Sequence, residues 1–122
     1  MKKKLSLVVV IIAIFAVAAV ARENIENRKI NYLISAVESL SGATFVRNGT
    51  EHNSKDAAKH LRLKLEKAGN RVKTAEDFIK LCASKSYMTN QPYMIKYTDG
   101  KMVASETYLR NKLKEYNTSK IR

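Results

Sequence analysis

The apolar stretch at the N-terminus of this 122-residue chain decides how much of it can form a folded domain. Three lysines precede the stretch, which runs from Leu5 to Ala21 with one interruption at Ser6 and ends in Ala19-Val20-Ala21. A basic start, an apolar centre and small residues at the end are the three parts of a secretory signal peptide. We predict a signal peptide over residues 1–21, cleaved after Ala21. The alternative is an uncleaved anchor, because the run approaches the length of a membrane span.

Cleavage would leave 101 residues and lower the formal net charge from +12 to +9. That length suits one small domain, so we predict a single domain over residues 22–118 and a frayed C-terminus over 119–122. The signal peptide predicts a periplasmic or secreted protein, which has no stable membrane anchor once it is cleaved. Cys82 is the only cysteine, so no intramolecular disulfide can form, and its apolar neighbours predict a buried core residue.

Helical periodicity and capping residues predict four helices in that domain. Their expected ranges are 23–40, 54–68, 75–83 and 105–116. Asn53 or Ser54 caps the second helix, and Thr74-Ala75-Glu76-Asp77 resembles a capping box at the start of the third. The positions expected to face the core are Ile30, Leu33, Ile34, Val37 and Leu40; Ala57, Ala58, Leu61, Leu65 and Ala68; Phe78, Leu81 and Cys82; and Tyr108, Leu109 and Leu113.

Two short β-hairpins are expected between these helices. Asn48-Gly49 and Asp99-Gly100 are dipeptides typical of two-residue hairpin turns, because their central residues accept positive φ. Strand alternation places Phe45 and Arg47 on one face, so Arg47 lies on the core side and needs a partner there. The order helix, hairpin, helix, helix, hairpin, helix predicts one small α+β domain of about four helices.

Four blocks of the sequence occur in a combination and order that is typical of one bacterial family. They are F-V-R-N-G at 45–49, H-L-R-L-K-L at 60–65, N-R-V-K-T-A-E-D-F-I at 70–79 and P-Y-M-I-K at 92–96. From about Tyr32 to Lys114 the chain resembles the YfeK-like family, small secreted bacterial proteins with a domain of unknown function. The resemblance implies an exported protein and brings no established activity.

Catalytic and metal-binding patterns are weak in this sequence. His52, His60 and Cys82 stand at no ligand spacing, no serine lies in a nucleophile elbow, and the glycines do not form a phosphate-binding loop. We therefore predict no catalytic residue, no metal site and no cofactor, and an enzyme is the minority interpretation. One alternative is a small hydrolase acting on envelope material, with His60 as general base. Another is a structural subunit that oligomerises through the Leu63 side of the second helix.

The best candidate for a binding surface is a basic, aromatic-edged groove inside the family-like blocks. It forms if the two hairpins pack beside the second helix, and it suits an anionic or peptide ligand. The alternative is structural: Arg47 pairs with a carboxylate, His60 bonds a backbone carbonyl and Tyr93 packs in the core. The candidate ligand-binding residues are Arg47, His60, Arg62, Lys64, Tyr93 and Lys96.

The strongly basic composition, with a pI near 9.9, raises the question of a polyanionic partner. Export argues against nucleic acid. The anions of a cell envelope remain, and the function predicted from the sequence is therefore a non-enzymatic binding or accessory protein for an anionic envelope component or a peptide.

Overall fold

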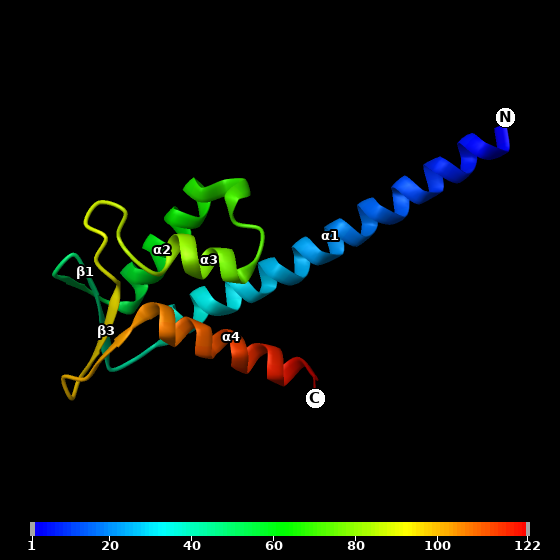
Figure 1. The fold of residues 1–122 in the computed structure, drawn as a ribbon. Coiled ribbons are helices and arrows are strands. Elements are labelled where there is room, and N and C mark those ends of the chain that lie inside the picture. The colour runs from blue at the N-terminus through cyan, green and yellow to red at the C-terminus, as the bar shows by residue number, and fades with distance from the viewer. Residues whose placement is uncertain (1, 122) are drawn as a thin grey trace.

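The structure, a computed structural model, describes the backbone of residues 2–121 and the side chains of residues 20–121. It is a two-layer α+β domain, as the sequence predicts, with helices packed on one face of a four-stranded sheet (Figure 1). The elements are α1 (Lys2–Ser39), β1 (Ala43–Arg47), β2 (Thr50–His52), α2 (Ser54–Ala68), the 3₁₀-helix η1 (Gly69–Arg71), α3 (Ala75–Cys82), β3 (Met94–Tyr97), β4 (Met102–Ala104) and α4 (Ser105–Ile121).

The two hairpins form a single antiparallel sheet in the strand order β2-β1-β3-β4. Strand β1 pairs with β2 across the Asn48-Gly49 turn and with β3 on its other side, where Phe45 faces Ile95. Because β1 and β3 lie far apart in the sequence, this central pairing is what fixes the first hairpin against the second. The sequence predicts both hairpins but not the pairing of β1 with β3 that joins them into one sheet.

The turn of the first hairpin has the conformation that its sequence predicts. Asn48 has φ 51° and Gly49 has φ 77°, both positive, as a type I′ turn requires. In the second hairpin Gly100 has φ 87°, and the Asp99 side chain accepts a hydrogen bond from the Lys101 amide.

The core lies between the helices and the face of the sheet that carries Phe45 and Ile95, both buried. Helix α1 contributes the predicted stripe, with Leu33 fully buried and Ile30, Ile34 and Val37 almost so. The opposite face of the sheet is solvated and carries an ion pair between Lys96 and Glu51 with 3.1 Å between Nζ and Oε1. The burial of Phe45, which we expected from strand alternation, is confirmed.

Helix α3 begins with the predicted capping box. The Thr74 side chain accepts a hydrogen bond from the Asp77 amide, and the Asp77 carboxylate accepts from the Thr74 amide. A further bond from the Lys73 amide lowers the pKa of Asp77. The helix buries Phe78, Ile79 and Cys82, and burial raises the pKa of the Cys82 thiol.

Three boundaries and positions differ from the prediction. Leu81 is half-buried and packs against the core as expected, whereas Ile79, which is not among the expected core positions, is fully buried beside Phe78. Helix α1 begins at Lys2 rather than near Glu23, because no glycine or proline interrupts the chain before Gly42. Helix α4 continues to Ile121, past the expected end at Tyr116.

The predicted signal peptide lies almost entirely outside the residues whose side chains are described, so it stays a prediction. In the part of the chain that the structure does describe, no helix is both long enough and apolar enough to cross a membrane.

Candidate functional site

A cavity of about 250 Å³ lies between helix α2, the sheet and the start of helix α4. Three small residues from different parts of the chain line it, namely Ala57 of α2, Ala83 directly after α3 and Ser105 of α4. Since protein interiors are close-packed, small side chains at facing positions leave a space that larger ones would fill. The apolar walls are formed by Val37, Phe45, Leu61, Ile95 and Leu109, and the polar lining by Arg47, His52, Asp56, Lys59, His60, Tyr93, Ser105 and Tyr108.

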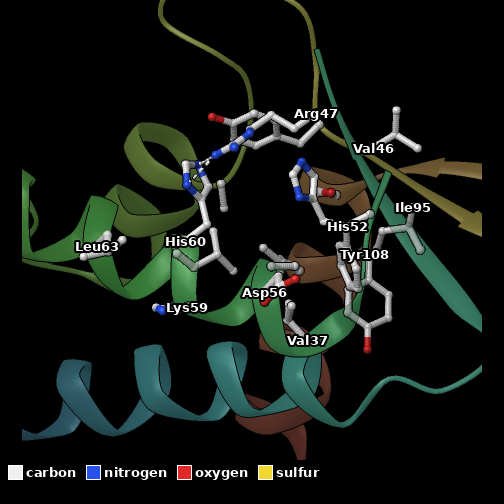
Figure 2. A pocket seen from close by; sticks show the side chains of 17 residues that line it. Val37, Val46, Arg47, His52, Asp56, Lys59, His60, Leu63, Ile95 and Tyr108 are labelled. Carbon is white, nitrogen blue, oxygen red and sulfur yellow. Dashed lines mark hydrogen bonds between the residues drawn. The ribbon is translucent and has the colours of Figure 1, made fainter. Parts of the chain in front are cut away.

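The cavity reaches the surface along helix α2. Asp56, Lys59 and Leu63 line it and are solvent-exposed, whereas Ile95 and Leu109 are fully buried. Figure 2 shows the Arg47 side chain reaching across one end of the cavity toward His60, with His52 beside it. The site is thus apolar inside, with Arg47 and the two histidines at one end and the exposed Asp56 and Lys59 along helix α2 (Figure 2).

Arg47 is held by a histidine rather than by a carboxylate. Its Nη1 lies 2.5 Å from Nδ1 and 2.7 Å from Nε2 of His60. A neutral imidazole has one acceptor nitrogen, because the other carries the proton, so the guanidinium donates to only one of the two. Strand alternation places Arg47 on the same face as Phe45, which is why the arginine meets helix α2.

The pKa of His60 is lowered to about 4, mainly because burial disfavours its charged form and further because Arg47 and Lys64 are cations nearby. At neutral pH the ring is therefore uncharged and acts as an acceptor for Arg47. It orients the guanidinium without cancelling its charge. Among the described residues, Arg62 and Arg110 form ion pairs with carboxylates, whereas Arg47 forms none.

His52 contributes an unused polar atom to the same cavity. Its Nε2 is buried and has no hydrogen-bond partner among the described residues. Leaving a buried polar atom unpaired costs about 1–3 kcal/mol, so such atoms are normally satisfied by water or by a ligand. The two-residue turn at Asn48-Gly49 places His52 opposite Phe45, on the core face of the sheet.

Lys64, Tyr93 and Tyr87 form an aromatic and cationic border next to His60. The Lys64 ammonium donates to the Tyr93 hydroxyl at 2.8 Å and lies 4.8 Å from the Tyr93 ring and 5.1 Å from the Tyr87 ring. The ring of His60 meets that of Tyr93 edge-on, with 6.1 Å between the centroids. This packing fixes the position of His60 and so of Arg47.

Four of the six residues predicted to bind a ligand come together here, namely Arg47, His60, Lys64 and Tyr93. Arg62 and Lys96 do not: Arg62 pairs with Glu38 of α1 at 2.8 Å, and Lys96 pairs with Glu51 on the solvated face of the sheet. The predicted structural alternative holds for Tyr93, which is buried. It does not hold for Arg47 or His60, because these two side chains bond to each other and not to a carboxylate or a backbone carbonyl among the described residues. The sequence reasoning missed His52, Asp56 and Ser105.

The arrangement gives little support to His60 as a general base. The hydrogen bonds that the structure gives this side chain, within the described residues, go to Arg47 and to no carboxylate or hydroxyl. A base with a pKa of about 4 flanked by cations accepts protons poorly at neutral pH.

Comparison with known proteins finds a family whose function is unknown. A family model described as a family of unknown function, DUF5329, matches residues 24–117. The uncharacterised protein YfeK of Salmonella typhimurium is 47% identical over 68 residues, which cover 56% of this chain and 57% of that protein. No solved structure matches.

Proposed function

The chain belongs to the DUF5329 family, whose function is unknown, and we propose that it is an exported, non-enzymatic binding protein for an anionic ligand with an apolar body. The apolar part of the ligand enters the cavity between α2 and the sheet, and its anionic group meets Arg47. A peptide fits the same description when an apolar side chain enters the cavity and a carboxylate faces the arginine.

The observation that carries the proposal is the uncompensated charge of Arg47 at an apolar cavity. A guanidinium held by a neutral imidazole keeps its full charge and its free N–H groups for an anion. A carboxylate partner would have neutralised it. The buried Nε2 of His52 supports the proposal independently, because it offers a second polar contact inside the same cavity.

The binding test uses the dye 1-anilinonaphthalene-8-sulfonate, whose fluorescence rises in apolar surroundings, with octanoate as a competitor. Arg47→Gln removes the cation and keeps a polar but shorter side chain. Charge-assisted hydrogen bonds contribute enough that the dye should bind at least about tenfold more weakly. Arg62→Gln is the matched control, because Arg62 is an exposed cation that is absent from the cavity lining.

Equal affinity of wild type, Arg47→Gln and Arg62→Gln would contradict the proposal, provided that thermal melting shows all three folded. Export has its own test. The protein recovered from a periplasmic fraction should have the mass of a chain that begins at Arg22. The mass of the full chain, including residues 1–21, would contradict cleavage after Ala21.

A second candidate, oligomerisation through helix α2, has one observation in its favour. Leu63 is 47% exposed, as expected for a residue turned away from the core. The same side chain also lies at the mouth of the cavity, which gives its exposure a different reason.

A further inference from the structure

The loop between α3 and β3, residues 84–92, presents two large side chains to solvent. Met88 is 93% exposed and Tyr87 is 68% exposed, which makes Met88 the most exposed large hydrophobic residue among those the structure describes. Single exposed apolar residues are common on protein surfaces and need no explanation. Here two are adjacent at the tip of one loop, which is closed by backbone hydrogen bonds.

Hydrogen bonds inside the loop prevent this tip from folding back. The Ser86 amide donates to the Gln91 carbonyl at 3.0 Å, and the Asn90 amide donates to the Ser86 carbonyl at 2.9 Å. The loop is also tied to the first hairpin, where the Thr89 hydroxyl donates to Oδ1 of Asn48 at 2.5 Å. The exposure of Met88 is thus built into the fold.

The surroundings of the tip are cationic. No aspartate or glutamate occurs between Phe78 and Thr98 in the sequence, whereas Lys85 directly precedes the tip. Lys64 approaches from helix α2, donates to the Lys85 carbonyl at 3.5 Å and lies 5.1 Å from the Tyr87 ring. An exposed methionine and tyrosine bordered by lysines have complementary chemistry to an anionic lipid surface, whose acyl boundary accepts apolar side chains and whose headgroups attract ammonium groups.

We propose that the 84–92 loop docks on an anionic lipid bilayer, with Met88 entering the boundary between headgroups and acyl chains and the exposed Lys85 facing lipid phosphates. Tyr87 lies at the headgroup level, where an aromatic ring with a hydroxyl is favoured. This contact is separate from the cavity, although the loop is bonded to Asn48, the neighbour of Arg47. Docking therefore brings Arg47 and its end of the cavity close to the lipid.

The test exploits the absence of tryptophan from the chain. Met88→Trp and Met102→Trp each introduce one reporter at an exposed methionine, the first on the loop and the second on strand β4. Both proteins are mixed with vesicles of phosphatidylcholine and phosphatidylglycerol whose acyl chains carry bromine. Quenching and a blue shift are expected at position 88 and not at 102. A retained N-terminal segment acts equally in both proteins, so it does not affect the comparison.

The contribution of lysine charge to vesicle binding is tested in the Met88→Trp protein. Lys85→Gln should weaken vesicle binding roughly fivefold, as expected for one lysine near an anionic surface, and Lys114→Gln on helix α4 serves as the control. Equal quenching at 88 and 102, or equal quenching at 88 by vesicles of phosphatidylcholine alone, overturns the proposal. Dye binding by the cavity is measured without lipid, so the two proposals can fail separately.

Discussion

The two halves of the hydrophobic core are built differently. Where α1 and α3 meet, Leu33, Phe78 and Ile79 are completely buried and none of them lines the cavity. Where α2 faces the sheet, Ala57 and Ala83 leave a hollow next to Arg47, His52 and His60. The difference indicates that the first half supplies stability, whereas the second keeps space and polar atoms that packing alone does not require.

Removing a large side chain from the half of the core where α1 and α3 meet should lower the free energy of unfolding more than any other change. Phe78→Ala deletes a fully buried ring, and such changes lower the free energy of unfolding by about 3–5 kcal/mol. Met102→Ala, at an exposed methionine, should change it by less than about 0.5 kcal/mol. Urea denaturation followed by circular dichroism measures both. A cost below about 1 kcal/mol for Phe78→Ala would show that this half is not well packed.

Acid should lower the free energy of unfolding through His60, which lies in the half of the core where α2 faces the sheet. The pKa of this group falls from 6.5 to about 4 on folding, so between these values the unfolded chain binds more protons. Stability is full above about pH 6.5 and decreases as the pH falls toward 4. The full shift corresponds to about 3 kcal/mol, which partial exposure of the ring reduces to about 1–2 kcal/mol.

The control for this pH dependence is His60→Gln, measured by urea denaturation across the same range. The variant keeps a polar side chain and every other titratable group, so its stability should depend less on pH than that of the wild type. If both proteins lose the same stability between pH 6.5 and pH 4, His60 is not the group responsible.

Filling the cavity should separate stability from binding. Ala57→Leu adds apolar volume next to empty space, so the free energy of unfolding should change by no more than about 1 kcal/mol. The dye should bind less, because the added side chain occupies its place. Asn31→Leu, at an exposed position of α1, is the matched control and should leave dye binding unchanged. A strongly destabilised Ala57→Leu protein would argue that the hollow is not real.

The smallest effect is expected at the mouth of the cavity. Leu63→Glu changes an exposed side chain, so stability should stay within about 0.5 kcal/mol of the wild type. Size-exclusion chromatography should give the same monomeric elution volume for both proteins. A larger wild-type species that dissociates in the variant would instead support an oligomer formed through this side of α2.

Local signals in the sequence account for most of the fold. The capping box at Thr74-Asp77 and the Asn48-Gly49 turn each act through neighbours a few residues away, and both occur as predicted. The pairing of β1 with β3 depends on residues far apart in the chain, such as Val46 and Met94, and has no local signature. The same holds for the cavity, which arises from small residues in three separate parts of the chain.

The candidate site was predictable in part. Arg62 follows His60 by two residues, and two residues turn a helix by about 200°, so the two side chains could not share a face. The hairpin register likewise places His52 beside Phe45 and could have drawn attention to it. The contact between Arg47 and His60 could not be derived, because it depends on how α2 packs against the first hairpin.

The bonds that tie the first hairpin to the 84–92 loop also bear on the chemical lifetime of the protein. Asparagine followed by glycine is prone to deamidation, in which the glycine amide nitrogen attacks the asparagine carboxamide carbon, expels ammonia and closes a succinimide ring. Water then opens the ring and leaves a carboxylate. Here the Asn48 carboxamide donates to Ser86 at 3.3 Å and accepts from Thr89, which restrains the rotation that attack requires. Loosening the loop would therefore accelerate ageing at Asn48, and the product would carry a new carboxylate directly beside Arg47.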